Sequence, residues 1–160
     1  MGFPMMRDWE CAAVAENARA DLVFRDVDVE AVAARMRGRL VYLATPYSKQ
    51  CLDGAGEWSY ARSVECGLAA AAWCGTFAHY GVTAMSPISQ AVDMVGASPD
   101  HQGLDPLDGK FWEAWCRPLL LACDAVVIPP LDGWRESEGI WHEARVAVSR
   151  AVPVFLLRGA

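Results

Sequence analysis

Four short runs of apolar residues divide the chain and predict buried β-strands. They cover residues 40–44, 82–85, Ala125–Ile128 and 152–157. The last two consist almost entirely of apolar residues and lack the apolar–polar alternation of a half-exposed strand. Continuous apolar runs of this length are typical of parallel strands in a sheet that is covered on both faces. The pattern therefore predicts a buried and mostly parallel sheet.

The segments between these runs predict helices and one long loop. Helical composition covers residues 58–80, which are rich in Ala, residues 110–122 and residues 137–150. Residues 96–109 are rich in Gly, Pro and Asp, which predicts a loop, and long loops of this kind often cover a site. Strands that alternate with helices form right-handed βαβ units. We therefore expect an α/β fold of the flavodoxin or Rossmann-like type, with a doubly wound, mostly parallel sheet of roughly four or five strands that binds ligands beyond the carboxyl ends of its strands.

The first 38 residues precede the first predicted strand and differ from the rest. Residues 12–20 and 29–37 each have the composition of a helix, and the stretch FRDVD connects them. We interpret residues 1–38 as an N-terminal helical extension that packs on the core or on a partner chain. Residues 39–160 then form the α/β domain.

Composition and charge narrow the class of protein. The chain has 160 residues, of which 54% are hydrophobic and 21% charged, so it can bury the core of one domain. Its formal net charge is -6, and its Lys and Arg residues are scattered. Because binding to a nucleic-acid polymer needs a basic stripe, the sequence argues against that class. A small anionic ligand is still compatible with the chain, since helix N-termini bind anions whatever the net charge.

Cysteines, histidines and the N-terminus give no sign of a metal, a cofactor or a membrane. The six cysteines form no CxxC pair, and neither they nor the three histidines have zinc-ligand spacing. No apolar stretch approaches the roughly 18 residues of a membrane span. The N-terminus also lacks the apolar segment of a secretory signal. We therefore expect a cytoplasmic protein that needs no cofactor and uses Cys as a small, reduced core residue.

The most suggestive spacing lies in SEGIWHE, where a loop should turn into a helix. Ser137 is a natural N-cap, and Gly139 leaves the first turn open to close approach. Glu143 lies one turn from Gly139 on the same face, about 6 Å along the axis. An anion at this helix N-terminus lies near a carboxylate, which matches the shape of a sugar phosphate. The spacing also fits an ordinary cap followed by a solvated Glu, which is the commoner case.

Five segments together resemble a known family. They are VYLATPYS (41–48), SPI (86–88), FWEAW (111–115), LLLACDAVVIPPLDGW (119–134) and SEGIWHEARVA (137–147). In this order they are similar to the nucleoside 2-deoxyribosyltransferase-like superfamily, and most of all to an uncharacterised bacterial and phage branch of it. The resemblance extends over residues 40–157, and its last segment is the most specific.

This resemblance implies cleavage of an N-glycosidic bond. Glu143 matches the helix Glu that attacks the anomeric carbon and forms a glycosyl-enzyme intermediate, which water or a second base resolves. Tyr42 matches the strand Tyr that hydrogen-bonds this Glu, although the residue alone also fits a core aromatic. Six positions before the nucleophile, the deoxyribosyltransferases carry Asp and the nucleoside 5′-monophosphate glycosidases carry Ser. Ser137 stands there and suits a phosphate, with Ser48 and Thr45 as further donors.

The chain departs from the family where the leaving base is handled. The family Asp on the second helix is replaced by Cys116, a thiol with an unperturbed pKa of about 8.5. Glu113, one turn earlier, and Asp108 are the alternatives for contact with the leaving group or the sugar. Pro118 should kink the helix unless the helix begins there. His142 points about 100° away from the nucleophile and receives no role.

Four tryptophans lie in or beside these motifs. Core packing or a subunit contact is the commoner role for such residues, and stacking on a base is the alternative. They are Trp112, Trp115, Trp134 and Trp141.

Three functions are compatible with these motifs. The first is hydrolysis of a nucleoside 5′-monophosphate to a base and a pentose phosphate. The second is base exchange between nucleosides, against which Ser137 argues. The third is nucleotide binding or sensing without turnover, which Cys116 favours. The expected partner is a small nucleotide or nucleoside, and we also expect a homo-oligomer, a dimer or larger, with the Ala-rich residues 68–73 as a contact face.

Overall fold

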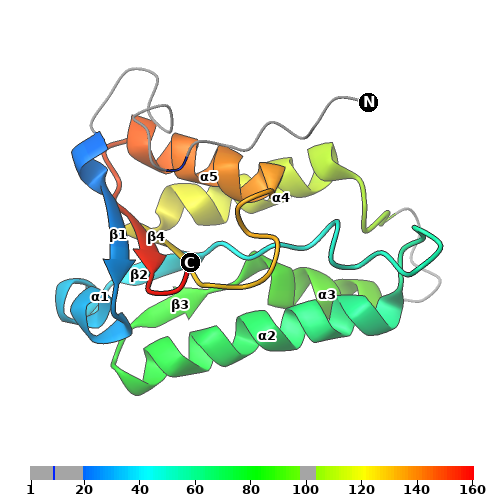
Figure 1. The fold of residues 1–160 in the computed structure, drawn as a ribbon, viewed down its shortest axis with the longest axis horizontal. Helices are drawn as coiled ribbons and strands as arrows, with labels where there is room; N and C mark the ends of the chain where they lie inside the picture. The colour runs from blue at the N-terminus through cyan, green and yellow to red at the C-terminus, as the bar shows by residue number, and fades with distance from the viewer. Residues whose placement is uncertain (1–8, 10–19, 98–103) are drawn as a thin grey trace.

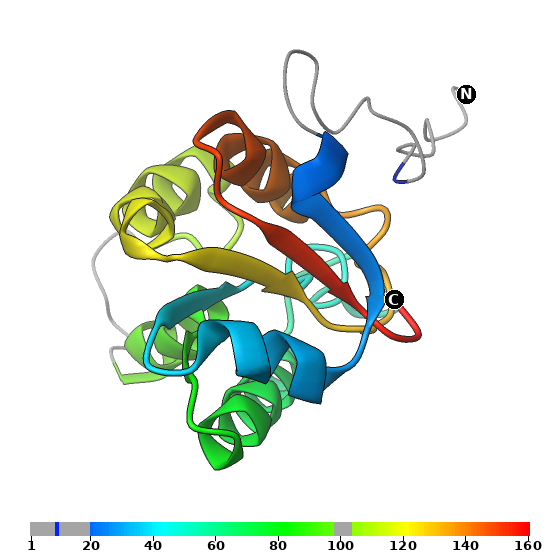
Figure 2. The same ribbon diagram turned by 90° about the vertical axis from the view of Figure 1, so that its left-hand side faces the viewer.

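The computed structural model describes Trp9 and residues 20–97 and 104–160, which form a five-stranded sheet between two layers of helices (Figure 1, Figure 2). The strand order is β1-β5-β4-β2-β3, and all neighbouring strands are parallel. The strands are β1 (Val23–Val27), β2 (Leu40–Leu43), β3 (Thr83–Met85), β4 (Ala125–Ile128) and β5 (Val154–Leu157). The helices are the short 3₁₀ helix η2 (Ala20–Leu22), α1 (Val29–Met36), α2 (Tyr60–His79), α3 (Pro87–Ala97), α4 (Gly109–Ala122) and α5 (Glu138–Ser149). This is the doubly wound α/β architecture that the alternating pattern predicts.

The two faces of the sheet bury separate sets of side chains, because successive residues of a strand point to opposite faces. In β2, Tyr42 packs with the side chains beneath α4 and α5, whereas Val41 and Leu43 pack with those beneath α1 and α2. Figure 2 shows these helix pairs on opposite sides of the sheet. The first cluster includes Val126, Ile128, Ile140, Ala144 and Leu156, and the second includes Val32, Phe77, Val127 and Phe155.

Local sequence sets the ends of the main helices. Ser59, Asp108 and Ser137 precede α2, α4 and α5, and each side chain accepts a hydrogen bond from a backbone N–H in the first turn. Helix α2 is followed by Gly81 with a φ of 78°, a conformation that glycine adopts without steric cost. The backbone N–H groups of Gly81 and Val82 bond to carbonyls of the last turn. This Schellman arrangement turns the chain directly into β3.

The sequence analysis predicts a helical N-terminal segment, but the structure shows that this segment also contains a strand. Residues of the FRDVD stretch form β1, which pairs with β5 at the edge of the sheet. Only Val23 of this strand is buried, because an edge strand has a single neighbour and tolerates polar residues, so the apolar pattern is weak. The helix predicted for residues 29–37 is present as α1. The helix predicted for residues 12–20 lies outside the described residues, apart from Ala20 in η2.

Two further features differ from the sequence expectation. Helix α3 was not predicted, and its last two residues, Gly96 and Ala97, fall within the expected loop. The signal was present in the sequence, because Ser86 caps the N–H of Ser89 and Pro87 occupies the first helical position. Helix α4 runs through Pro118 as one element from its start at Gly109, so the helix does not begin at the proline.

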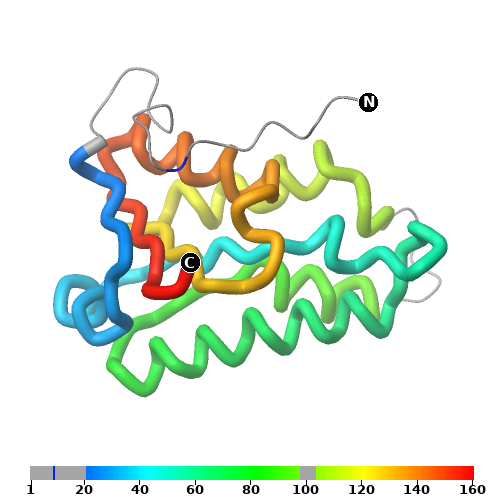
Figure 3. The backbone as a smooth tube through the Cα atoms, in the orientation of Figure 1, coloured from blue at the N-terminus to red at the C-terminus, as the bar shows by residue number. Residues whose placement is uncertain are grey.

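The topology places a crevice between β2 and β4. These strands are neighbours, but the chain leaves β2 through α2 toward β3 and leaves β4 through α5 toward β5, on the opposite side. Doubly wound sheets bind ligands at such a switch point, beyond the carboxyl ends of the strands. Figure 3 shows the long stretch that follows β2 running past this end of the sheet before the chain turns back into α2.

Candidate active site

A cavity of about 810 Å³ opens at this switch point. Its walls come from the stretch after β2, from α3, from one side of α4 along most of its length, and from α5 with the loop before it. The α3 side is apolar and presents Ile88, Ala91 and Val95. The volume lies in the range of pockets that enclose small organic ligands. The cavity therefore brings together the carboxyl end of the sheet and the opening of α5, where the sequence analysis places its candidate residues.

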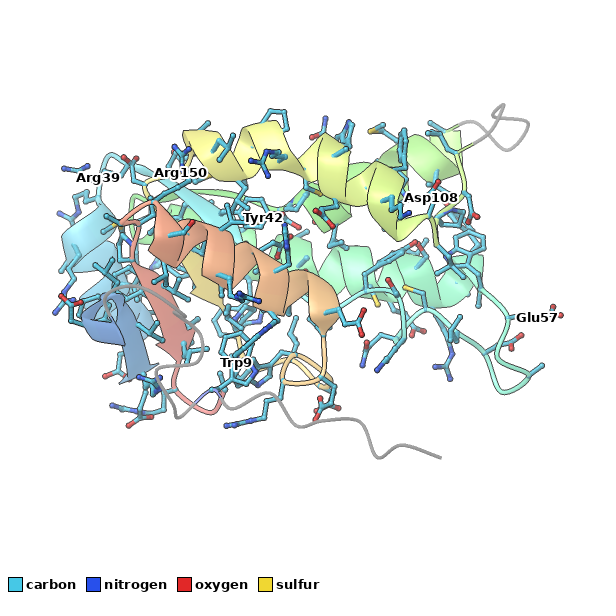
Figure 4. All side chains as sticks on the ribbon, turned by 90° about the horizontal axis from the view of Figure 1, so that it is seen from above. Trp9, Arg39, Tyr42, Glu57, Asp108 and Arg150 are labelled. Carbon is cyan, nitrogen blue, oxygen red and sulfur yellow. The ribbon has the colours of Figure 1, made fainter. Side chains whose placement is uncertain are left out.

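Tyr42 contacts Glu143, and the Glu143 side chain lines this cavity. The Tyr42 hydroxyl donates a hydrogen bond of 2.5 Å to Glu143 Oε1, although the residues are 101 positions apart. Tyr42 is fully buried and lies near α5 (Figure 4), and Glu143 lines the cavity. Burial raises the pKa of Glu143 to about 7, and the bond from Tyr42 only partly opposes this effect. Near neutral pH the carboxyl is thus poised between its two protonation states.

Cys116 completes this buried group from α4. Its thiol interacts with the Tyr42 hydroxyl, and it lines the cavity together with Glu143. Burial and the nearby charge of Glu143 raise the pKa of Cys116 to about 11, so the thiol is neutral at physiological pH. Burial and the same carboxylate raise the pKa of Tyr42 well above its usual value. Cys116, which replaces the Asp of the family that the sequence resembles, therefore lies near Glu143 as a neutral thiol.

The N-terminus of α5 opens into the same cavity. Ser137 caps the helix by accepting a hydrogen bond of 3.3 Å from the Ile140 N–H, which leaves its hydroxyl hydrogen available to a ligand. Gly139 follows in the first turn, and a Cβ built there meets only Ser137 Oγ, at 3.9 Å. A ligand can therefore approach the backbone at this point, where the helix dipole favours negative charge.

Thr45 and Ser48 follow β2 and line the same cavity. Thr45 is buried, with 7% of its surface exposed. Its hydroxyl oxygen, Oγ1, has no hydrogen-bond partner within the described part of the chain. Buried polar groups are rarely left unpaired, so an unpaired hydroxyl that lines a cavity points to a bound partner. Ser48 is exposed at the cavity wall.

Asp108 and Glu113, the other two candidates for contact with the leaving group, have different partners in the structure. Asp108 caps α4 by accepting a hydrogen bond of 3.1 Å from the Phe111 N–H, so its carboxylate serves the helix (Figure 4). Glu113 instead pairs with His142, with 3.2 Å between Glu113 Oε1 and His142 Nε2. Both partners line the cavity. The sequence analysis gave His142 no role because it points away from Glu143 on α5. In the structure His142 contacts Glu113 of α4, and it lines the same cavity as Glu143.

The tryptophans divide between core and cavity. Trp134 and Trp141 pack against Trp9, with ring centroids 5.0 and 4.8 Å apart. They therefore belong to the core beneath α5. Trp112 lines the cavity, where its indole N–H donates a bond of 2.9 Å to the Asp105 carbonyl, and its ring meets that of Trp115 edge-on. Of the four tryptophans named in the sequence analysis, Trp112 is the one that can contact a ligand in this cavity.

The cavity carries charges of both signs. Lys49, Lys110 and Arg117 contribute cations, and Glu136 and Glu138 flank Ser137. Among residues 20–97 and 104–160, no group of three or more His, Cys, Asp or Glu side chains is arranged to hold a metal ion. In the same part of the chain no helix combines the length and apolar character needed to cross a membrane.

Comparison with known proteins gives a family but no activity. A search of the curated proteins finds no match to this chain. The family model of the domain of unknown function DUF1937 matches residues 39–158, which include all five motif segments. The match does not itself connect the chain to the deoxyribosyltransferase-like superfamily, so that resemblance and the catalytic roles drawn from it stay predictions. On the extent of the match, the chain belongs to the DUF1937 family.

Proposed function

We propose that this protein cleaves the N-glycosidic bond of a nucleoside 5′-monophosphate and releases the base and a pentose phosphate. The observation that carries the proposal is the buried pair of Tyr42 and Glu143, which lies one helical turn from an open helix N-terminus in the same cavity. A carboxylate at that distance from an anion site suits a substrate with a phosphate at one end and an anomeric carbon at the other.

The phosphate binds at the start of α5 in this proposal. Ser137 and Gly139 line the cavity, and so do Ser48 and Thr45, whose hydroxyl is unpaired among the described residues. Hydroxyls and backbone N–H groups hold a phosphate without the repulsion that a carboxylate at position 137 would cause. Lys49 adds a cation to the same cavity.

The chemical step uses Glu143 as the nucleophile. One oxygen accepts the hydrogen bond from Tyr42, and the other attacks the anomeric carbon while the carbon–nitrogen bond breaks and its electron pair leaves with the base. Water then attacks the same carbon and releases Glu143. A pKa of about 7 leaves a large fraction of Glu143 ionised at neutral pH while keeping the carboxylate poorly solvated and reactive.

The departing base needs a proton, and Cys116 is poorly suited to supply it. Its raised pKa makes the thiol a weak acid. The contact between Glu113 and His142 is a better source, because histidine is the side chain that most often acts as a general acid and both residues line the cavity. We therefore assign contact with the leaving group to this pair.

The experiment that tests the proposal is chromatographic detection of free base. The wild type and Glu143→Gln are incubated with each ribo- and deoxyribonucleoside 5′-monophosphate and with the matching nucleosides. We expect release from a monophosphate by the wild type and none by the variant. Release that survives in Glu143→Gln would exclude the assigned nucleophile.

A second set of substrates isolates the leaving-group step. A 7-methylated purine nucleotide carries a cationic base that departs without protonation. We expect His142→Asn to slow release of ordinary purines by about 10²-fold, the lower range for general acid catalysis, and to leave release of the methylated base nearly unchanged. Equal losses on both substrates would remove the pair from the leaving-group role and leave the role of Glu143 standing.

One observation favours a different class of function. A neutral thiol occupies the place beside Glu143 where the resembling enzymes carry an acid, which suits a site that binds nucleotides without turnover. Nucleotide that raises the melting temperature with no release of base would favour this binding function. Base exchange, the third candidate, would appear in the same assay as a new nucleoside only when an acceptor base is added, since it requires exclusion of water from the intermediate.

A further inference from the structure

Two cysteines that play no part in the proposed reaction lie in direct contact. The Sγ atoms of Cys51 and Cys66 are 3.5 Å apart, and the Cys51 thiol donates a hydrogen bond to Cys66. Cys51 is buried in the stretch that follows β2, whereas Cys66 lies on α2 and is partly exposed. Both are free thiols. A disulfide is about 2.05 Å long, so the sulfur atoms need to approach by only about 1.5 Å to be joined.

The surroundings make the two thiols unequal. The hydrogen bond from Cys51 lowers the pKa of Cys66, and the Arg62 guanidinium acts in the same direction, against burial and the charge of Glu65. The same hydrogen bond and burial raise the pKa of Cys51. Because the thiolate is the reactive form, Cys66 is the sulfur that attacks an oxidant, and Cys51 is positioned to react with the product.

The pair is connected to the wall of the cavity. The Cys51 N–H donates to the Tyr47 carbonyl at 3.0 Å, and the Tyr47 hydroxyl bonds to Ser63 Oγ on α2 at 2.8 Å. Tyr47 and Gln50 line the cavity. The Gln50 side chain also fills the space where Gly133 would carry a Cβ, in the loop that leads to α5. Cys51 is therefore joined, through Tyr47 and Gln50, to the segment that lines the cavity.

We propose that Cys51 and Cys66 form a thiol modification site that hydrogen peroxide converts to a disulfide. The Cys66 thiolate attacks one peroxide oxygen, the O–O bond breaks, and the departing hydroxide takes up a proton to become water. The Cys51 sulfur then attacks Cys66 sulfenic acid, gives up its proton, and the S–O bond breaks to release a second water. Two thiols and one peroxide thus yield one disulfide and two waters, and the two electrons lost by sulfur reduce the peroxide.

The disulfide would alter the cavity wall whether or not the cavity is catalytic. It ties the stretch after β2 to α2 across a sequence separation of 15 residues. A closed loop restricts the unfolded chain, so the melting temperature in the absence of reductant should rise. Ligand affinity should change as well, because Tyr47 and Gln50 are held by the same stretch.

The test is oxidation of the folded full-length chain with hydrogen peroxide, followed by blocking of the remaining thiols and non-reducing peptide mapping. We expect one linked peptide that joins Cys51 to Cys66, with the loss of two hydrogen atoms and full reversal by dithiothreitol. Cys74→Ser is the matched control, because Cys74 lies on the same helix and burial raises its pKa. This variant should form the link at the wild-type rate.

The cysteine variants decide the order of the two steps. In Cys51→Ser, we expect Cys66 to accumulate as sulfenic acid, which a dimedone probe traps. In Cys66→Ser, we expect Cys51 to react at least about ten-fold more slowly with peroxide than Cys66 does in the wild type, since Cys51 is fully buried and burial both shields the sulfur and raises its pKa. Circular dichroism establishes that each variant is folded. Absence of the linked peptide from the folded wild type, or its formation only in urea, would overturn the proposal, and neither result depends on whether the protein cleaves nucleotides.

Discussion

Each face of the sheet buries a hydrophobic cluster, but the two faces differ in the polar groups that they enclose, and strand β2 takes part in both. Val41 and Leu43 face α1 and α2, where the cluster around Phe77 consists of hydrophobic side chains. Tyr42, between them in sequence, faces α4 and α5 and holds a carboxyl and a thiol at its hydroxyl. Because strand residues alternate between faces, a single polar residue converts one face to a site without disturbing the other.

The difference shows what burial of a polar group costs and what it provides. On the face covered by α1 and α2, burial is favourable throughout because the groups removed from water are apolar. On the other face, the fold encloses Glu143 and raises its pKa to about 7, which means that the ionised group is destabilised in place. Burial of the Glu143 carboxylate thus lowers the stability of the folded protein, and the same poor solvation makes the carboxylate more reactive. The following variants test this contrast, from the largest expected effect to the smallest.

Glu143→Gln should give the largest change, with opposite effects on activity and stability. Loss of the nucleophile should slow base release by at least about 10³-fold, equivalent to about 4 kcal/mol of transition-state stabilisation. The raised pKa means that folded Glu143 keeps its proton to higher pH than unfolded Glu143. Stability therefore falls as pH rises from 4.5 toward about 7 and stays lower above it. The variant avoids this loss and should be more stable than the wild type at pH 8 by up to about 3 kcal/mol.

Urea unfolding at pH 5 and pH 8 provides the measurement. The two proteins should differ more at pH 8 than at pH 5. A difference that does not depend on pH would show that the carboxyl of Glu143 is well solvated in the folded protein.

Phe77→Ala should affect the other face alone. Phe77 is fully buried among side chains of α1, β2 and α2, and its removal leaves a large cavity. Truncations of this kind cost about 3–5 kcal/mol. Urea unfolding should report this loss, while the rate of base release per folded molecule stays close to that of the wild type. A comparable fall in the rate would show that the two faces are coupled through the strands.

Tyr42→Phe should produce a moderate loss of activity and a displaced pH profile. The variant keeps the packing but removes a hydrogen bond to a charged group, which is worth about 1.5–3 kcal/mol, or roughly 10–100-fold in rate. The bond lowers the pKa of Glu143, so its removal should raise that pKa further. Since the ionised form attacks, the rate of the wild type should rise with pH through about 7. The pH dependence of kcat should show this rise at higher pH in the variant, and an unmoved profile would assign the ionisation to another group.

Thr45→Val should give the smallest and most informative change. The substitution removes a buried hydroxyl that has no partner in the described residues and keeps the shape of the side chain. Removing an unpaired buried polar group should stabilise the free protein by about 1 kcal/mol. If the hydroxyl contacts ligand, the same change should raise the KM for a nucleoside monophosphate about five-fold, since a lost hydrogen bond is worth about 1 kcal/mol. Thermal unfolding and KM together separate the two effects, and Thr83→Val offers a matched control, because the same substitution is then made at an exposed threonine of β3 that does not line the cavity.

Local pattern was sufficient for most of the architecture. The apolar runs at β4 and β5 and the cap at Ser137 depend on neighbouring residues, so they can be recognised in the sequence directly. The parallel, doubly wound sheet follows from the alternation of strands and helices. The edge strand β1 could not be recognised in this way, because what makes it a strand is its pairing with β5 rather than its own composition.

The candidate site combines features of local sequence with contacts between residues that are distant in the sequence. The spacing of Ser137, Gly139 and Glu143 is local and was readable along one helix. The contact of Tyr42 with Glu143 was expected only from a family resemblance, since no spacing argument joins residues 101 positions apart.

The chain by itself therefore determined the fold class, the start of α5 and the position of one candidate carboxylate. Only the tertiary structure decided which groups share a space: Cys116 beside Tyr42, His142 with Glu113, Cys51 with Cys66, and the unpaired Thr45 hydroxyl in the cavity wall. The physical reason is that strand and helix periodicities are short-range properties of the backbone. Burial, pKa and pairing are set instead by side chains that approach from distant parts of the sequence once the layers have packed.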